Sequence, residues 1–355
     1  MLRRRTTLYK PGTDFVIQEQ TGLGVSLTGS LSGLRSAASK KLSAVVPCYN
    51  EEEGLGELVK RLSAACAAAA GSDYEIVLVN DGSADGTWAE MVRLSRDVPQ
   101  IVGVNLARNH GHQLALTAGL SLARGERIFI VDADLQDPPE LLTEMMAALD
   151  AGADVAYGKR VHRDGETWFK KSSASAFYRL LQRLTDAPIP ADTGDFRLMT
   201  RQVLDVLMNM PEQHRFVRGM VAWIGFRQVA VPYRRDPRFA GTTKYPLRKM
   251  VAFAMDAITG FSVAPLRLSL YLGLFSIFLA VLVGAFALWS YLTMKTAPGW
   301  TSIAIIVLAF GAMQMFCLAI MGEYLGRTYI QTKQRPLFII KSIHQGETPP
   351  PGANS

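Results

Sequence analysis

The chain has 355 residues and a formal net charge of +7, and 49% of its residues are hydrophobic while only 19% are charged. This length allows one large domain and a further segment, and so low a charged fraction is unusual for a wholly soluble protein. No basic stripe is interleaved with aromatic residues, which argues against a nucleic-acid-binding protein. Cys48, Cys66 and Cys317 lack metal-site spacing and predict free thiols in a reducing compartment.

Residues 1–40 carry six basic and two acidic residues and show no sustained hydrophobic period. Their start resembles the charged end of a signal peptide, but no apolar stretch follows it. We therefore expect a flexible cytoplasmic extension. Its positive charge suits either anionic lipid headgroups or a solubilising tail.

Strand-like and helix-like stretches alternate from residue 41 to residue 158. The expected strands are 42–46, 75–79, 101–105, 127–132 and 154–157, and the expected helices are 51–70, 85–97, 111–123 and 138–151. Asn50 and the three glutamates after it predict a capped start for the first helix. The alternation predicts a mostly parallel sheet with helices on both faces.

Polar motifs follow four of these strands, where ligands of such sheets bind. They are Tyr49-Asn50-Glu51, Asn80-Asp81-Gly82-Ser83, Arg108-Asn109-His110-Gly111 and the acidic stretch 132–136. His110 and His112 lie in a glycine-containing turn, where packing or capping is the commoner role, and they are left out of the predicted metal site.

The stretch IFIVDADLQDPPE at 128–140 predicts a buried strand that delivers Asp132 and Asp134 on the same side. Two neighbouring carboxylates repel each other unless a cation lies between them. Oxygen ligands favour Mg2+ or Mn2+, with phosphate oxygens completing the shell, and Gln136 adds a neutral oxygen. The stretch therefore predicts a metal that holds a diphosphate.

Residues 159–266 are less regular. We expect helices at 168–184 and 201–210 and a strand at 228–233. An apolar stripe runs through 246–265, with Arg248 and Lys249 off it. This pattern predicts an amphipathic helix along a membrane interface or, alternatively, a core helix of the soluble domain.

Two apolar stretches follow. Residues 268–294 and 296–322 contain no charged side chain, and a membrane span needs roughly 20 apolar residues. Arg267 precedes the first stretch and Arg327 follows the second, so the positive-inside rule places both outer ends in the cytoplasm. The expectation is a membrane hairpin.

The motifs VVPCYNEEE, VNDGSADGT, LARNHGHQLAL and VDADLQDPP resemble those of the inverting family-2 glycosyltransferases. With YGKR, DTGDFRLM, AGTTKYPLRKM and the hairpin, the chain from about 42 to 335 resembles the polyprenyl-phosphate glycosyltransferases. The bacterial bactoprenol glucosyl transferases are the nearest subgroup, and the dolichol-phosphate mannosyltransferases are similar. The resemblance implies an α/β GT-A fold, with a Rossmann-like, mostly parallel sheet.

The resemblance also implies site residues. The metal, Mg2+ or Mn2+, would be held by Asp132, Asp134 and Gln136, with Asp134 essential for transfer. The implied nucleotide-sugar contacts are Pro47, Tyr49, Asn50, Glu51, Asp81, Asp85 and Asp132. A carboxylate such as Asp81 is a good acceptor for the imide N–H of uracil, although Asp81-Gly82 is also typical of a plain turn.

On the acceptor side, Arg160 matches the arginine that binds the lipid phosphate. Asp195 matches the proposed catalytic base, yet a phosphate monoester is largely ionised at neutral pH, so we expect Asp195 to position a substrate instead. The further lipid-phosphate candidates are Lys170, Lys171, Ser175, Arg197 and Lys244. Lys170 and Lys171 could equally form a solvated helix face, and residues 235–244 could be a plain surface loop rather than a mobile one.

The resulting expectation is a membrane-bound enzyme that moves a hexose, taken as glucose, from a UDP-sugar to undecaprenyl phosphate. Mannose, N-acetylglucosamine, galactose or aminoarabinose donors are alternatives, and a polysaccharide synthase or an inactive scaffold ranks lower. We expect a homo-oligomer, a tetramer by resemblance, in the bacterial inner membrane with both termini cytoplasmic.

The expected parts are the extension 1–40, the catalytic domain 41–240, the interfacial segment 241–266, the hairpin 267–327 (spans 268–294 and 298–322) and the cytoplasmic tail 328–355.

Overall fold

The computed structural model describes residues 40–161, 193–234, 262–293 and 299–345. Of these, residues 40–161, 193–234 and 335–345 belong to one compact unit, and residues 262–293 and 299–334 belong to a second. The expectations for the 1–39 extension, the helix at 168–184 and the amphipathic stripe up to residue 261 lie outside the described residues.

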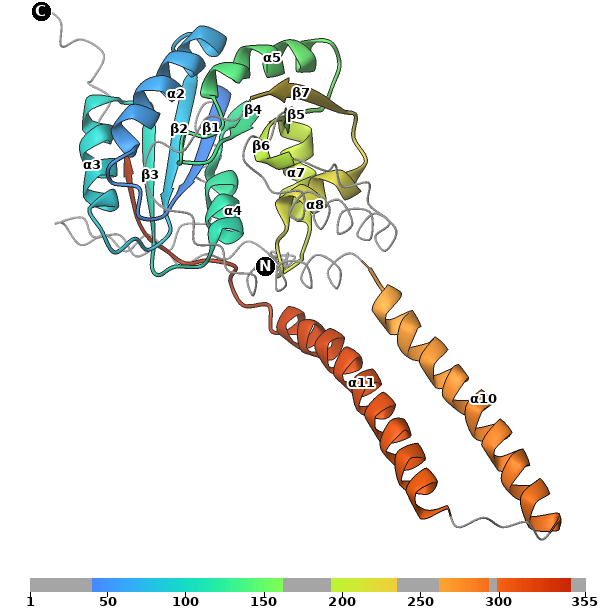
Figure 1. Ribbon diagram of the computed structural model, residues 1–355. Helices are drawn as coiled ribbons and strands as arrows, with labels where there is room; N and C mark the ends of the chain where they lie inside the picture. The colour runs from blue at the N-terminus through green and yellow to red at the C-terminus, as the bar shows by residue number, and fades with distance from the viewer. Residues whose placement is uncertain (1–39, 162–192, 235–261, 294–298, 346–355) are drawn as a thin grey trace, which may run out of the picture. The chain divides into compact units, whose positions relative to one another are not determined.

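The first unit is built on an eight-stranded sheet in the order β7-β5-β6-β4-β1-β2-β3-β8 (Figure 1). Six strands run in one direction, whereas β6 and β8 run against them, so the sheet is mostly parallel as predicted. The strands are β1 (Lys40–Cys48), β2 (Tyr74–Asn80), β3 (Ile101–Leu106), β4 (Gly125–Ile130), β5 (Val155–Arg160), β6 (Thr193–Thr200), β7 (Gln228–Tyr233) and β8 (Ile340–Gln345).

Helices cover both faces of the sheet. Helices α2, α3 and α5 lie on one face, where α2 contacts the other two, and α4, α7 and α8 lie on the other. They are α2 (Leu55–Ala70), α3 (Thr87–Asp97), α4 (His112–Leu122), the short helix η1 (Pro139–Leu141), α5 (Leu142–Asp150), α7 (Arg201–Asn209) and α8 (Val217–Ile224).

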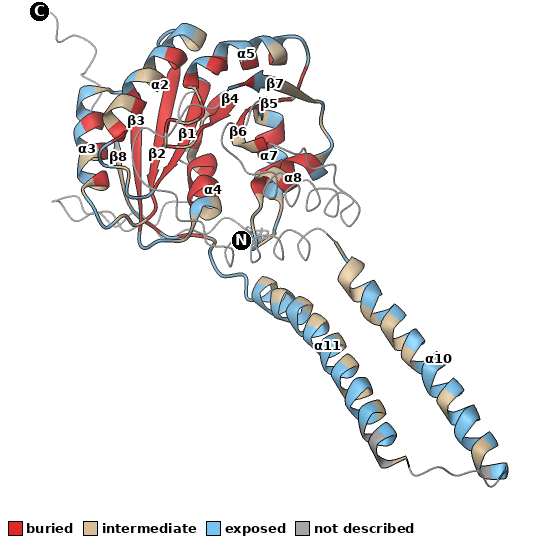
Figure 2. Ribbon diagram, viewed as in Figure 1, coloured by how far each residue is buried: buried red, intermediate tan, exposed pale blue. Residues whose placement is uncertain are grey.

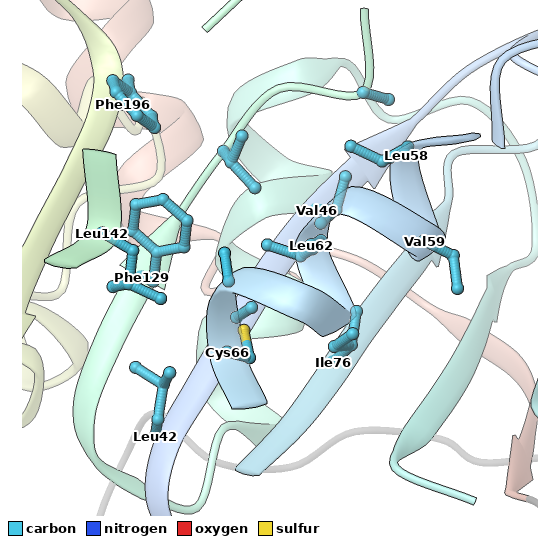
Figure 3. Packing of buried hydrophobic residues seen from close by; sticks show 14 of the residues in the cluster. Leu42, Val46, Leu58, Val59, Leu62, Cys66, Ile76, Phe129, Leu142 and Phe196 are labelled. Atoms are coloured by element: carbon cyan, nitrogen blue, oxygen red, sulfur yellow. The ribbon is translucent and has the colours of Figure 1, made fainter. Parts of the chain in front are cut away.

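The core lies between the sheet and α2 (Figures 2 and 3). Alternate residues of β1, among them Leu42 and Val46, point to the face that α2 covers, as the pleat of a strand requires; Val46 lies beside Leu62 and Leu42 lies nearer Cys66. Cys48 and Cys66 are buried here as free thiols, which agrees with the prediction. Burial raises the pKa of Cys66 to about 12, so this thiol is unreactive.

Three local expectations were wrong. The first helix begins at Leu55 rather than near residue 51, and Gly54, not Asn50, precedes it. Asn50 instead has a left-handed backbone with φ of 55°, which asparagine tolerates better than most residues. Strand β4 ends at Ile130, so Asp132 and Asp134 lie in the following turn and do not share a strand face.

The sequence analysis did not predict β6, β8 or α8. Strand β8 lies within the stretch 328–355 that was expected to be a tail, and it pairs antiparallel with β3. Phe338 and Ile340 are fully buried, and His344 Nδ1 lies 2.9 Å from the hydroxyl of Ser95 on α3. Residues 335–345 are therefore part of the first unit and its sheet.

The second unit contains the two long apolar helices α10 (Ala264–Leu292) and α11 (Trp300–Thr332). They contact each other, and the Tyr324 hydroxyl donates a 2.6 Å hydrogen bond to the carbonyl of Ser262. Residues 264–290 and 305–332 have mean hydropathies of 2.4 and 2.2. In the most apolar part of each stretch, no residue is buried inside the protein. Both helices are long and apolar enough to cross a membrane, and α11 extends beyond the expected end at residue 322.

Candidate active site

The candidate site lies at the carboxyl edge of the sheet, where polar loops follow β1, β2, β3 and β4. Parallel strands end at the same edge, so these loops are neighbours although they are far apart in the sequence. Strand β6 runs in the opposite direction and therefore begins at this edge, which brings Asp195 to the same place. Strands β5 and β7 end there with Arg160 and Tyr233.

The loops after β1 and β2 are joined by hydrogen bonds. The side-chain oxygen of Asn50 accepts the N–H of Ala84 at 2.9 Å, and the N–H of Glu51 donates to the Thr87 hydroxyl at 2.9 Å. Asp85 accepts hydrogen bonds from the N–H and hydroxyl of Thr87, and these outweigh burial and lower the pKa of Asp85. Hydrogen bonds thus hold the side chains of Asn50 and Asp85 and the backbone of Glu51 at the junction of the two loops.

Two other predicted nucleotide residues differ in exposure. Tyr49 is 49% exposed at the end of β1, so its ring is available to a ligand. Pro47 is buried within β1, and its part in a nucleotide pocket remains a prediction.

Asp81 ties the loop after β2 to the loop after β3. One carboxylate oxygen accepts the N–H of His110 at 2.7 Å, and the other accepts the N–H of Gly111 at 2.9 Å. Burial raises the pKa of Asp81 despite these two bonds. A Cβ at Gly82 would lie 2.5 Å from the backbone nitrogen of Asn109, so the close approach of the loops requires glycine here. Contact between Asp81 and a base remains a prediction.

Asp132 is the most perturbed carboxylate of the predicted metal site. Burial raises the pKa of Asp132 to about 6; the charge of His112 opposes this rise, while Asp195, Asp137 and Asp134 add to it. Its Oδ1 is buried and has no hydrogen-bond partner among the described residues. A negative group in this position is stabilised by a cation.

The donor set around Asp132 fits a hard divalent ion in part. No cluster of three or more His, Cys, Asp or Glu side chains suited to a metal occurs in the described part of the chain. The turn that carries Asp132 and Asp134 is tightened by the N–H of Gln136, which donates to Asp134 at 3.2 Å. Two carboxylates with one amide oxygen leave positions for diphosphate oxygens, as is usual for Mg2+.

His112 and Gln113, the first two residues of α4, reach Asp195. The Gln113 amide donates to Oδ2 of Asp195 at 2.6 Å, and His112 Nε2 lies 3.2 Å from the same oxygen. His112 Nε2 is also 3.6 Å from Oδ1 of Asp132. The imidazole therefore lies between the predicted metal site and the predicted acceptor residue.

The charges in this cluster stabilise one another. Burial disfavours a charged His112, but its hydrogen bond to Asp195 and the nearby carboxylates outweigh burial and raise the pKa of His112 to about 9. Burial also disfavours a charged Asp195, yet the His112 bond and the charges of His112, Arg197 and Arg218 hold the pKa of Asp195 well below its usual range. At neutral pH this is an imidazolium beside a carboxylate.

Arg197 is only 2% exposed. Its Nε donates to the carbonyl of Asp195 at 3.1 Å, and its terminal nitrogen donates to the carbonyl of Gly194 at 3.0 Å. These bonds assign Arg197 to holding the backbone around Asp195. A contact between Arg197 and a lipid phosphate remains a prediction that this burial does not favour.

Arg160 belongs to a buried polar cluster with Tyr233 and Asp137. Its Nε donates to the Tyr233 hydroxyl at 3.1 Å, and its terminal nitrogen lies 3.7 Å from Oδ1 of Asp137. The Tyr233 hydroxyl donates to the same oxygen of Asp137, which is fully buried. Burial opposes the charge on Arg160, but Tyr233 and Asp137 outweigh it and raise the pKa of Arg160.

Four predicted lipid-phosphate residues lie outside the described ranges: Lys170, Lys171, Ser175 and Lys244. The structure instead adds His112, Gln113, Asp137 and Tyr233, which the sequence analysis did not select. His112 and Gln113 directly follow a sheet-end motif, and Asp137 follows the acidic stretch. Their position next to these motifs could have identified the three residues from the sequence. No sequence motif adjoins Tyr233.

Three comparisons relate the chain to known proteins. The family model "Glycosyl transferase family 2" matches residues 43–208. The uncharacterized glycosyltransferase YkcC of Bacillus subtilis (strain 168) is 45% identical over 303 residues, which is 85% of this chain and 94% of that protein. The prophage bactoprenol glucosyl transferase homolog of Escherichia coli (strain K12) is 37% identical over 304 residues, 85% of this chain and 99% of that one.

Among solved structures, residues 1–349 of S. aureus TarS align with a TM-score of 0.40 and 21% identity, covering 55% of this chain and 59% of that one. The family relationship rests on the two relatives, whose identity extends over most of both chains. The mostly parallel sheet with its loops at the carboxyl edge is the GT-A-like fold that the sequence motifs implied. This chain therefore belongs to glycosyltransferase family 2, and it is an enzyme of the transferase class.

Proposed function

We propose that the protein transfers glucose from UDP-glucose to undecaprenyl phosphate with inversion at the anomeric carbon. The observation that carries the proposal is the meeting of two charged clusters at one sheet edge. Asp132 with His112 and Asp195 forms one cluster, and Arg160 with Tyr233 and Asp137 forms the other. Similarity to the bactoprenol glucosyl transferase of Shigella phage SfII, 36% identical over 86% of this chain, supports the polyprenyl acceptor.

The donor side follows from the loops after β1, β2 and β4. The half-exposed Tyr49 is suited to stack on a nucleobase, and Asn50, Glu51 and Asp85 shape the loops around it. Asp81 is only 3% exposed and both of its oxygens accept backbone N–H groups, so its proposed contact with the base rests on the sequence resemblance. Asp132, Asp134 and Gln136 would hold Mg2+ or Mn2+. When bound, this ion neutralises charge on the leaving diphosphate.

The acceptor side centres on Asp195. The lowered pKa of Asp195 makes its carboxylate a weak base. A polyprenyl phosphate has its second pKa at about 6, so at neutral pH most of the acceptor phosphate has already lost its last proton. Asp195 therefore acts by position: its oxygen atoms, held by His112 and Gln113, orient the incoming groups. The lipid phosphate is then the nucleophile without prior deprotonation.

Arg160 is the cation proposed to receive the acceptor phosphate. A guanidinium presents several donors in a planar arrangement that matches phosphate oxygens. Tyr233 and Asp137 engage part of that group, and Arg160 keeps 19% of its side chain exposed. Lys170, Lys171, Ser175 and Lys244 are proposed to assist, as the sequence resemblance implies.

The helices α10 and α11 are proposed to form a hairpin in the bacterial inner membrane, with the catalytic domain and both termini in the cytoplasm. Arg267 precedes the first apolar stretch and Arg327 follows the second, which is the arrangement of a hairpin with cytoplasmic ends. An acceptor with a long polyprenyl chain is itself held in the bilayer, so a membrane-bound enzyme meets it there. A homo-tetramer is proposed by resemblance.

The test is a transfer assay with purified protein in lipid nanodiscs, undecaprenyl phosphate and a panel of labelled sugar nucleotides. The expected product is an undecaprenyl-linked glucose that forms from UDP-glucose with Mg2+ or Mn2+ and not after chelation. Asp134→Ala should abolish transfer in folded protein. Transfer of a different sugar would correct the donor, whereas no lipid-linked product from any donor would refute the proposal.

A further inference from the structure

Gln113 joins three elements at the centre of the site. Its amide nitrogen donates to Oδ2 of Asp195 at 2.6 Å, and its amide oxygen accepts the N–H of Val217 at 2.8 Å. Gln113 is the second residue of α4, Asp195 lies near the start of β6, and Val217 is the first residue of α8. One uncharged side chain on α4 thus bonds both the start of α8 and the Asp195 carboxylate.

We propose that Gln113 is the positioning residue that fixes the Asp195 carboxylate for glycosyl transfer. This inference rests on the proposed function, because it assigns a role in the same reaction. The direction of each bond is determined by chemistry. Asp195 is an acceptor when ionised, so Gln113 must present its NH2 group there, and its oxygen is then directed to the N–H of Val217.

The geometry restrains Asp195 from two sides. Oδ2 receives the Gln113 amide and faces His112, whereas Oδ1 lies 4.0 Å from the guanidinium of Arg197. A carboxylate held at one oxygen cannot rotate freely, which keeps its charge directed to a fixed place. Its side chain retains 13% exposure, so it remains open to a bound substrate.

The bond to Val217 has a separate consequence. The N–H of Val217 lies in the first turn of α8, where a backbone donor has no acceptor within the helix. The side-chain oxygen of Gln113 accepts this N–H instead. Loss of Gln113 could therefore harm the protein through α8 alone, without any effect through Asp195. The two roles are separable because each uses a different atom of the amide.

Two substitutions make this separation. Gln113→Met has similar length but removes both the donor and the acceptor. Gln113→Glu keeps an oxygen for Val217 and replaces the donor with a carboxylate that repels Asp195. Gln228→Glu is the matched control, because the Gln228 amide donates a hydrogen bond between elements, to the carbonyl of Val221, and Gln228 lies at the opposite end of β7 from Tyr233.

The expected result is a loss in kcat of about 10- to 100-fold at pH 7.5 for both Gln113 variants, the size of one lost hydrogen bond to a charged group. The KM for the UDP-sugar should change little, and Gln228→Glu should turn over like the wild type. Gln113→Glu should also regain activity, relative to the wild type, as the pH falls toward about 5.5. The introduced carboxyl group donates to Asp195 again once it is protonated. The Asp195 carboxylate raises the pKa of that group, whereas the positive charges of His112, Arg197 and Arg218 around Asp195 oppose the rise.

Several outcomes would overturn the inference. Near-normal kcat in Gln113→Glu with a loss only in Gln113→Met would assign Gln113 to the α8 contact alone. Failure of both variants to fold, measured by thermal unfolding and gel filtration, would give Gln113 a structural role and refute the positioning role. A pH profile of Gln113→Glu parallel to that of the wild type would refute the donor role. If the wild-type protein forms no polyprenyl product, the proposed function fails instead.

Discussion

Tyr233→Phe tests whether the Tyr233 hydroxyl positions Arg160. The substitution removes one oxygen and leaves the ring, which packs edge-on against Phe196 at 5.5 Å between centroids. That oxygen donates to Asp137, which is fully buried, and accepts from Nε of Arg160 at 3.1 Å. Both bonds involve a charged partner, so the change isolates their contribution from that of hydrophobic packing.

The magnitude follows from the partners. Hydrogen bonds to charged groups contribute about 1.5–3 kcal/mol, and a buried carboxylate that loses a donor costs a similar amount. We expect Tyr233→Phe to lower the free energy of unfolding by roughly 2 kcal/mol. For a domain of roughly 150–250 residues this corresponds to a fall in Tm of about 4–8 °C.

The functional effect should fall on the acceptor. Arg160 would lose the bond that orients its guanidinium, and a small displacement of a positioning group lowers turnover steeply. We expect kcat/KM for undecaprenyl phosphate to drop about 10-fold or more, while the KM for UDP-glucose is unchanged. The assays are differential scanning fluorimetry in detergent and steady-state transfer kinetics with each substrate varied in turn.

Tyr157→Phe is the matched control. Tyr157 lies on the neighbouring strand β5, and its hydroxyl makes no hydrogen bond within the described residues. If Tyr233→Phe matched Tyr157→Phe in both Tm and acceptor kinetics, the cluster would not position Arg160. A loss confined to the UDP-glucose KM would place the cluster on the donor side and refute the reasoning.

The remaining predictions concern Asp195, His112 and Ile340. Asp195→Asn should keep near-normal turnover at pH 7 while Asp195→Ala loses it; equal losses would favour proton transfer. Because the pKa of His112 is raised in the folded state, the stability advantage of wild type over His112→Gln in metal-free protein should be complete below about pH 6.5. It should disappear as the pH rises through about 9, and a pH-independent difference in Tm would contradict this. Ile340→Ala should cost about 2–5 kcal/mol of unfolding free energy, since Ile340 is fully buried in β8; unchanged Tm would show that β8 does not stabilise the sheet.

Much of the fold was predictable because its signals are local. The expected β1, β2 and β3 agree with the structure within two residues at each end, since buried parallel strands are short apolar runs between turn residues. The partly buried edge strand β7 also has the expected bounds. The start of α2 was misplaced because Asn50 and its glutamates resemble a helix cap. In the structure, hydrogen bonds between the loops after β1 and β2 use those residues instead.

The sequence by itself determined the alternating α/β order, the acidic stretch at 132–136, the two apolar helices and the family motifs. Each is encoded by neighbouring residues, through hydrophobic period or direct spacing. Tertiary structure alone decided that Asp195 meets His112 and Gln113, 83 and 82 positions away, and that β8 returns to the sheet after the hairpin. The reason is physical: strand direction and order set which loops meet, and a short pattern carries no information about partners so distant in the chain.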